Sequence, residues 1–354
     1  CFSVRLRAPH TGSIDIATYY MSNYTCEFAR ALTERAIEGG YNFADCLITP
    51  DGCTMMNRAV ENMELLKTLG KGKEKFFFEY MEIPMKADDN GLNLYTLQCK
   101  NHILKPLHEH YGIDISDKAI RQAVAEHNRI CELIRAIGEY RKGDKPRITG
   151  YEFHVLNLVS FTCPKYLILP YLRETLEELK KRQPDAKPTF RARVAIVGSE
   201  IDDPNLTKLI ESCGALVVSD RYCFGSMPGR EEIPLEEGKD VLQSIADYYM
   251  WRNQCPRAMG PENIIARKKY IFDLVEKYHA DGIIVENMKF CEYWGYERAQ
   301  DGMWFYEGYE LPRSIPVCQI EKDYTSAASG QLRTRFQAFI ESVEIKKIQE
   351  GVKR

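Results

Sequence analysis

Several motifs that identify common enzyme classes are absent from this sequence. No G-x-x-x-x-G-K-S/T occurs, which excludes a P-loop for ATP or GTP within these residues. No G-x-G-x-x-G follows a predicted strand, so the dinucleotide-binding fingerprint is missing, and the acidic turn Gly198-Ser199-Glu200 would repel a pyrophosphate. No C-x-x-C occurs, which excludes the usual zinc-ribbon, thioredoxin and ferredoxin spacings.

The sequence also lacks an excess of basic charge and any long apolar run. It has 48 Lys and Arg against 51 Asp and Glu, whereas nucleic-acid-binding domains usually carry a basic surface. No run approaches the roughly 20 apolar residues of a membrane-spanning helix, and no secretory signal opens the sequence. We therefore expect a cytoplasmic protein whose 12 cysteines stay reduced. The sequence begins at Cys1 rather than Met, and we expect that an upstream segment is missing.

Short β-branched runs alternate with amphipathic helical patterns along the chain. This alternation is typical of α/β proteins with a doubly wound, mostly parallel sheet. We predict an α/β domain with a helical appendage over residues 1–147 and a second α/β domain over 148–354, joined by a helical connection that starts near residue 150. The predicted strands are 3–8, 46–49, 75–83, 193–198, 216–218, 283–285 and 315–320.

Three cysteines far apart in the sequence stand at the ends of predicted elements. Cys26 opens a helix, Cys53 follows a strand and a Pro-Asp-Gly turn, and Cys291 follows the buried strand 283–285. Because ligands of open α/β sheets sit beyond the carboxyl ends of the strands, these three thiols form our candidate site. Thiolates suit iron–sulfur clusters or zinc, although scattered cysteines more often only pack in a core.

The other cysteines are weaker candidates for a site. Cys223 follows a strand and Cys255 lies in a turn, so either could line the same crevice or be a buried loop thiol. Four more lie within or beside helical or strand patterns and are expected to be small core residues, namely Cys99, Cys131, Cys213 and Cys318.

The last predicted helix, 329–348, opens with the basic string SGQLRTR. Cations near a helix start are unfavourable to the helix dipole. We therefore expect Arg333 and Arg335 to point partly inward, either to a buried anion or to ordinary ion-pair partners.

Five strings together resemble the 2-hydroxyacyl-CoA dehydratase family, which includes the active-site subunits of benzoyl-CoA reductase. The resemblance implies two Rossmann-like domains with a [4Fe-4S] cluster held between them. Carried over residue by residue, it places the cluster ligands at Cys26, Cys53 and Cys291. The strings are YTCEFAR, DGCTMMNR, RVAIVGSEIDDPNLTKLIESCGALVVSDRYCFGS, DGIIVENMKFCEYWGYE and EKDYTSAASGQLRTRFQAFIE.

The resemblance also implies an activity and two partners. The chain would be a subunit of a radical dehydratase that removes water from a 2-hydroxyacyl-CoA through a ketyl radical and gives an enoyl-CoA. A related second subunit would complete a heterodimer, and a separate ATP-dependent iron–sulfur activator would supply the electron. Phe290, Tyr293 and Trp294 beside Cys291 would help to exclude water.

Several alternatives stay open at this point. The chain could belong to a benzoyl-CoA reductase, or to a double-cubane ATP-dependent reductase in which Cys46, Cys223 or Cys255 supplies extra ligands. It could also be an electron-transfer or scaffold subunit whose cluster never meets substrate, or a protein with a structural zinc. No residue of the sequence is assigned as the general base.

Overall fold

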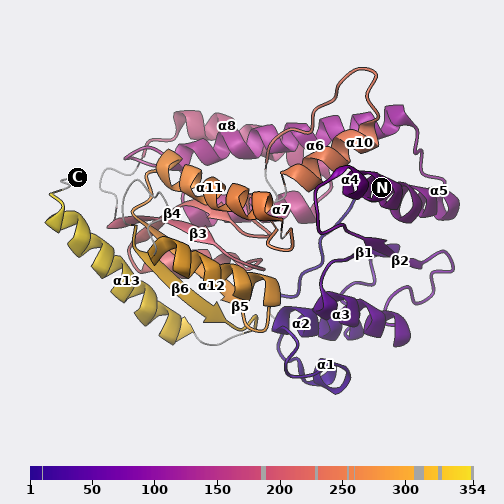
Figure 1. The fold of residues 1–354 in the computed structure, drawn as a ribbon, viewed down its shortest axis with the longest axis horizontal. Coiled ribbons are helices and arrows are strands. Elements are labelled where there is room, and N and C mark those ends of the chain that lie inside the picture. The colour runs from indigo at the N-terminus through magenta and orange to yellow at the C-terminus, as the bar shows by residue number, and fades with distance from the viewer. Residues whose placement is uncertain are drawn as a thin grey trace.

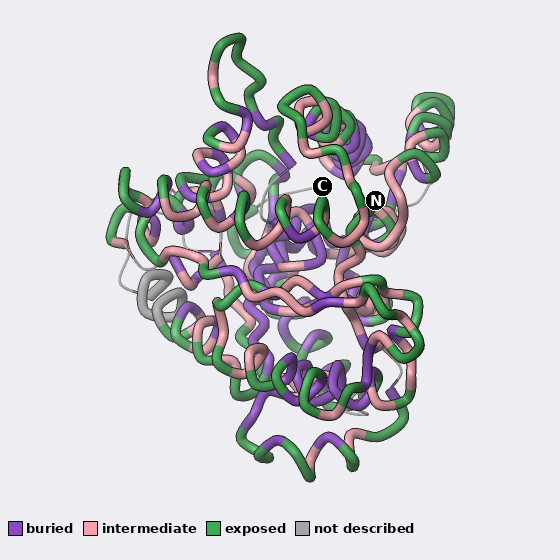
Figure 2. The backbone as a smooth tube through the Cα atoms, turned by 90° about the vertical axis from the view of Figure 1, so that its right-hand side faces the viewer, coloured by how far each residue is buried: buried purple, intermediate pink, exposed green. Residues whose placement is uncertain are grey.

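The computed structural model has an α/β fold with two parallel sheets, as predicted (Figure 1). The smaller sheet pairs β1 with β2, and the larger sheet has the strand order β4-β3-β5-β6. Buried backbone is concentrated in the interior of the molecule, and exposed backbone on the outer helix faces and loops (Figure 2). The structure describes residues 1–9, 11–184, 189–227, 230–252, 255–258, 260–306, 315–325 and 329–351.

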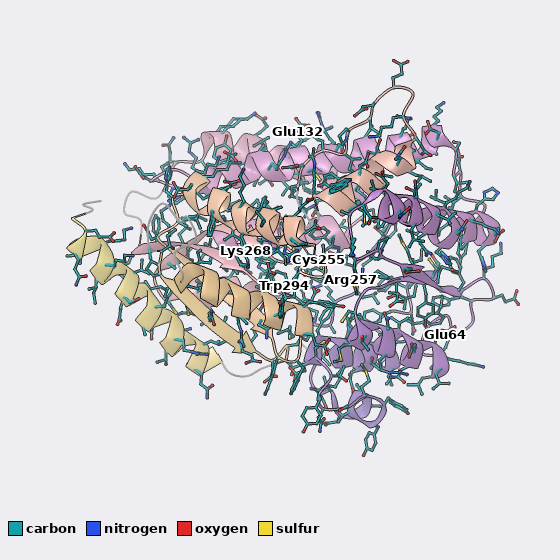
Figure 3. The ribbon with its side chains drawn as sticks, viewed as in Figure 1. Glu64, Glu132, Cys255, Arg257, Lys268 and Trp294 are labelled. Atoms are coloured by element: carbon teal, nitrogen blue, oxygen red, sulfur yellow. The ribbon has the colours of Figure 1, made fainter. Side chains whose placement is uncertain are left out.

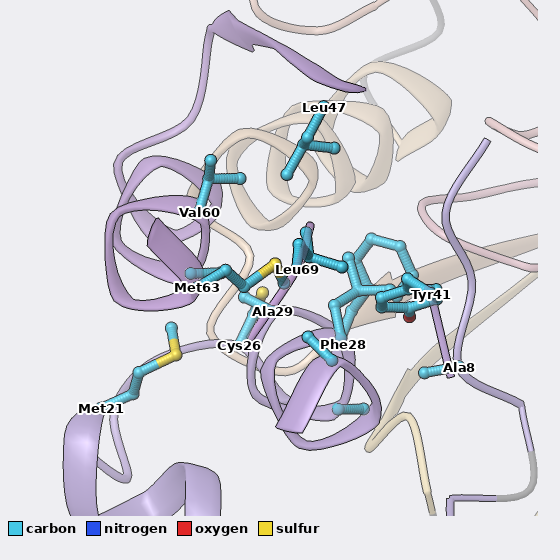
Figure 4. Close-up of a cluster of buried hydrophobic side chains, with 14 of the residues drawn as sticks. Ala8, Met21, Cys26, Phe28, Ala29, Tyr41, Leu47, Val60, Met63 and Leu69 are labelled. Carbon is cyan, nitrogen blue, oxygen red and sulfur yellow. The ribbon is translucent and has the colours of Figure 1, made fainter. Parts of the chain in front are cut away.

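The small lobe, residues 11–82, is built on the two-stranded sheet. Burial alternates along the first part of β1, because successive side chains of a strand point to opposite faces. Its buried face packs on helices through a core that includes Phe28, Leu47 and Met63 (Figure 4). The elements are α1 (Asp15–Tyr20), α2 (Glu27–Ile37), β1 (Cys46–Asp51), α3 (Thr54–Leu65) and β2 (Phe77–Glu82).

A helical layer, residues 89–181, lies above both sheets in the view of Figure 1. Side-chain caps fix two of its helix starts: Ser116 Oγ accepts from the Ala119 N–H at 3.3 Å, and Thr149 forms a capping box with Glu152. None of the described helices combines the length and apolar character needed to cross a bilayer. The layer contains α4 (Asp89–Cys99), a π-helical turn (Lys100–Leu104), α5 (Lys105–Tyr111), α6 (Asp117–Gly138), a 3₁₀ turn (Glu139–Arg141), α7 (Gly150–Thr162) and α8 (Lys165–Lys181).

The large lobe, residues 189–351, is built on the four-stranded sheet. Every residue of β3, β4 and β5 is buried, as expected of parallel strands covered on both faces. Side chains of α9 and α13 pack on one face of the sheet, and side chains of α11 and α12 pack on the other. The elements are β3 (Ala192–Val197), α9 (Pro204–Ser212), β4 (Ala215–Arg221), α10 (Val241–Trp251), α11 (Pro261–Lys277), β5 (Gly282–Met288), α12 (Glu292–Tyr306), β6 (Val317–Lys322) and α13 (Ser329–Gln349).

The strand order of the large sheet predicts a ligand-binding crevice beside β3. The chain runs from β3 outward to β4, and then returns across β3 to β5 and β6. The carboxyl ends of β3 and β5 therefore flank a topological switch point, which is where open α/β sheets bind ligands. This edge faces the small lobe, because Phe224 and Met288 of the large lobe pack in the small-lobe core.

Two local predictions are wrong, and in both the side chains decide the outcome. Residues 3–8 form no strand: Arg5 Nη1 donates to the Cys223 carbonyl and Arg7 Nη2 to the Asp202 carbonyl, each at 2.5 Å, so the segment crosses to the large lobe. Arg333 and Arg335 are exposed rather than inward, because apolar side chains such as Phe336 occupy the buried face of α13.

The predicted boundary between residues 147 and 148 stays a prediction. Ile148 is buried in the core of the helical layer together with Ile134 of α6 and Leu172 of α8. Among the cysteines expected in the core, Cys318 is half-buried, and three are buried as predicted, namely Cys99, Cys131 and Cys213.

Candidate functional site

The three candidate cysteines each stand directly before a helix. Cys26 is the N-cap of α2, Cys53 is the N-cap of α3, and Cys291 immediately precedes α12. The first backbone N–H groups of a helix have no partner within it, and the helix dipole places partial positive charge at this end. The helix dipole at each of these positions therefore favours a negative charge on the sulfur.

The structure brings these three thiols, from both lobes, into one electrostatic neighbourhood. Burial raises the pKa of the Cys26 thiol to about 12; the Cys53 and Glu200 charges raise it further, and the Ala29 N–H opposes the shift. Burial likewise raises the pKa of Cys291, with further contributions from Cys26 and Cys53. Cys26 lies among Met21, Ala29 and Met63 in the small-lobe core (Figure 4).

Cys223 and Cys255 are two further cysteines of the same electrostatic neighbourhood. Cys223 follows β4, and its N–H donates to the Ser199 carbonyl at 3.2 Å. Burial raises the pKa of the Cys223 thiol well above its usual value, and Glu200 and Cys255 add to the shift. Cys46 lies elsewhere: it is at the opposite end of β1 from the turn that carries Cys53, roughly 17 Å away at the usual rise of a strand.

Glu200 is a further residue of the crevice that the sequence analysis did not select. Burial raises its pKa to about 7, and the charges of Asp202 and Glu286 add to this, while Cys223 and Arg5 oppose it. The sequence signal was its position after the buried strand 193–198, at the edge of the sheet where ligands bind. The acidic character of the turn by itself indicates only that it would repel a pyrophosphate.

A rigid turn holds Glu200 at this edge. Ser199 donates to Glu286 Oε2 from its N–H at 2.8 Å and from its hydroxyl at 2.9 Å. The same hydroxyl oxygen accepts from the Met288 N–H at 2.9 Å, which joins the turn to β5. A Cβ at Gly198 would lie 2.6 Å from Glu286 Oε2, so only glycine allows this approach.

Further contacts join the two lobes near the candidate cysteines, and the aromatic residues beside Cys291 differ in burial. Arg257 Nη2 donates to the Asp51 carbonyl at 2.8 Å, and thereby ties the segment of Cys255 to the turn before Cys53. Figure 3 shows Cys255, Arg257 and Trp294 near the junction of the lobes. Trp294 is buried as expected, but Phe290 is 37% exposed and makes an edge-on ring contact with Tyr24.

Comparison with known proteins identifies the family. The family model of the 2-hydroxyglutaryl-CoA dehydratase D-component matches residues 1–343. The chain belongs to this family. It is similar to the (R)-phenyllactyl-CoA dehydratase beta subunit of Clostridium sporogenes, with 24% identity over 331 residues, 92% of this chain and 83% of that one. It is also similar to the (R)-2-hydroxyglutaryl-CoA dehydratase, subunit beta, of Acidaminococcus fermentans, with 21% identity over 333 residues, 92% and 82% of the two chains. The resemblance predicted from the sequence is therefore confirmed.

The thiols of this dehydratase-family chain suit an iron–sulfur cluster by chemistry and by placement. Three cysteine sulfurs at three helix starts form a soft donor set, and the helix dipoles offset part of the cost of burying thiolate charge there. Within the described ranges, no three His, Cys, Asp or Glu side chains converge to hold a single metal ion. A cubane cluster does not need that convergence, because each thiolate binds a different iron atom. The ligand role of Cys26, Cys53 and Cys291 stays a prediction.

Proposed function

We propose that the chain is the iron–sulfur subunit of a 2-hydroxyacyl-CoA dehydratase, which removes water from a 2-hydroxyacyl-CoA to give an enoyl-CoA. One observation carries the proposal: thiols from three helix starts in both lobes act electrostatically on one another, and one of them follows β5 beside the switch point of the large sheet. Membership of the dehydratase family and relatives named as dehydratase beta subunits support the same reaction class.

Cys26, Cys53 and Cys291 would hold a [4Fe-4S] cluster, and the chain's part is to stabilise its anionic ligands. When bound, the cluster would supply low-potential one-electron chemistry. One-electron reduction would convert the acyl thioester to a ketyl radical, which can expel its 2-hydroxyl group. Buried thiols with raised pKa values resist ionisation, and bound iron would overcome that resistance as a coordinating metal does. The helix starts of α2, α3 and α12 would then stabilise the thiolates.

The crevice would also protect a reactive substrate from water. Trp294 and Met288, 4% and 1% exposed, form an apolar wall beside Cys291. Excluding water strengthens electrostatic interactions inside a site and suppresses side reactions of unstable intermediates. The half-buried Cys53 would lie on the more open side of the site.

Two protein partners and a location complete the proposal. A related second subunit would complete a heterodimer, since the relatives are named as beta subunits of their dehydratases. A separate ATP-dependent iron–sulfur activator would deliver the electron, in keeping with the missing P-loop. The protein would act in the cytoplasm, where its cysteines stay reduced.

Anaerobic reconstitution tests the proposed activity. The chain is co-expressed with its partner subunit, mixed with activator, ATP and a reductant, and supplied with a panel of 2-hydroxyacyl-CoA thioesters and, separately, with benzoyl-CoA. Enoyl-CoA formation is measured by mass spectrometry. We expect turnover by the wild type and by Cys46→Ala, and loss of turnover in Cys53→Ala. Ring reduction of benzoyl-CoA without dehydration would contradict the proposal.

A further inference from the structure

We propose that Glu200 is the proton-transferring residue of the crevice: its carboxylate takes the β-proton of the bound acyl thioester and returns it to the departing hydroxyl. The inference rests on the proposed dehydratase function and assigns a role that the sequence left without a residue.

Glu200 lies at the same edge of the large sheet as the candidate residue Cys291. It follows β3, a central strand, between Cys223 after β4 and Cys291 after β5. Its charge acts on the thiols of both Cys26 and Cys291. A thioester bound beside Cys26 and Cys291 would therefore lie near the Glu200 carboxylate.

Among the residues that the structure describes, Glu200 lacks the strong hydrogen-bond or ion-pair partner that each of its acidic neighbours has. Glu286 binds the Ser199 turn, Asp202 accepts from the Tyr324 hydroxyl at 2.6 Å, and Asp220 pairs with Arg141 at 3.1 Å. Within the described part of the chain, the hydrogen-bond partner of the Glu200 carboxyl is the thiol of Cys223, a weak donor. A half-buried carboxyl without a strong partner costs stability, which a catalytic role would explain.

The proton affinity of Glu200 also suits a group that accepts and returns a proton. A pKa raised to about 7 by burial leaves both protonation states populated near neutral pH, as a group that accepts and returns a proton requires. The ionisable groups that face Glu200 come from the turn itself, β4, β5, the N-terminal segment and the cysteine loops. They are Arg5, Cys26, Asp202, Cys223, Cys255, Glu286 and Cys291.

The proposed step balances in atoms and electrons. The electron pair of the β C–H bond becomes the new C=C bond, and the pair of the C–O bond leaves with the hydroxyl as hydroxide. Glu200 carries the proton from carbon to hydroxide, so water forms and the carboxylate is restored. The low-potential one-electron donor that activates the thioester recovers its electron at the end, so the net reaction is dehydration alone.

The test compares Glu200→Gln and Glu200→Asp with the exposed control Glu237→Gln in the reconstituted complex. Substrates carry deuterium at the β-carbon, and we measure kcat, KM, the isotope effect on kcat, iron content and the EPR spectrum. Glu200→Gln is expected to keep its iron and EPR spectrum, with KM within a few-fold, and to lower kcat by about 100-fold or more. Glu200→Asp should recover part of kcat with a larger isotope effect, and Glu237→Gln should match the wild type.

The outcomes separate this inference from the proposed function. A wild-type kcat in Glu200→Gln overturns the role of Glu200 and leaves the dehydratase intact. Loss of iron in both Glu200 variants assigns the residue a structural role and also overturns the inference. A wild type that keeps its iron but dehydrates no thioester overturns the proposed function, and the inference falls with it.

Discussion

His154 shows how a single buried residue supports the loop that leads from Glu200. It is fully buried in α7, with Nδ1 2.9 Å from Thr207 Oγ1 and Nε2 3.2 Å from the Ile201 carbonyl. A neutral ring satisfies both contacts, since Nε2–H donates to the carbonyl and Nδ1 accepts from the hydroxyl. Burial lowers the pKa of His154 from 6.5 to about 4.

The lowered pKa of His154 predicts that the folded protein loses stability in mild acid. The unfolded chain takes up a proton near pH 6.5 that the folded chain refuses until about pH 4. The contribution of the neutral His154 ring to the free energy of unfolding is therefore fully present above pH 6.5, and it is lost as the pH falls toward 4. We compare the free energy of unfolding by urea at pH 7.5 and pH 5. Between these pH values, His154→Gln should lose about 2 kcal/mol less of this free energy than the wild type. The same loss in both proteins would contradict the assignment.

The sequence pattern predicts Cys26, Cys53 and Cys291 as candidate site residues, but it does not predict Glu200 as one. Cys26, Cys53 and Cys291 could be found because each follows a clear strand or opens a clear helix. The proposed role of Glu200 depends on its surroundings, and its electrostatic neighbours Cys26 and Cys291 are distant in sequence. The orientation of Arg333 was predicted wrongly, because Ser212 and solvent can satisfy it at the surface of α9.

At the scale of elements, α13 closes one face of the large sheet. Phe336 is fully buried there, and Phe339 approaches Gly282 so closely that a Cβ would lie 2.8 Å from its ring. The apolar residues of α13 recur at helical spacing, so this packing face could be predicted from the sequence. The false strand at 3–8 arose because alternation alone does not show that Arg5 and Arg7 bind loop carbonyls.

Truncating Phe336 tests the contribution of α13. Phe336→Ala removes a ring from a closed core and should lower the free energy of unfolding by about 3–5 kcal/mol. Ile348→Ala, at a position of the same helix that is 72% exposed, is the matched control and should change it by less than about 0.5 kcal/mol. Chemical denaturation of each variant and of the wild type measures these changes in the free energy of unfolding. Equal effects would mean that α13 does not complete this core.

At the scale of the whole molecule, the candidate site exists only because the two lobes meet. Cys26 and Cys53 belong to the small lobe, Cys291 to the large lobe, and Arg257 joins the lobes through the Asp51 carbonyl. Strand and helix patterns predicted an α/β fold with parallel sheets. They could not give the contact between lobes, which depends on side chains far apart in the sequence.

Iron bound per chain is the most direct test of this account. Protein purified under strict anaerobic conditions is analysed for iron and acid-labile sulfide, and its EPR spectrum is recorded after reduction. We predict about four irons and four sulfides per wild-type chain, as in a single cubane. Cys26→Ala, Cys53→Ala and Cys291→Ala should each lose most of this iron, whereas Cys46→Ala, at the far end of β1, should keep it. A wild type without iron, or full iron in all three site variants, would contradict the account.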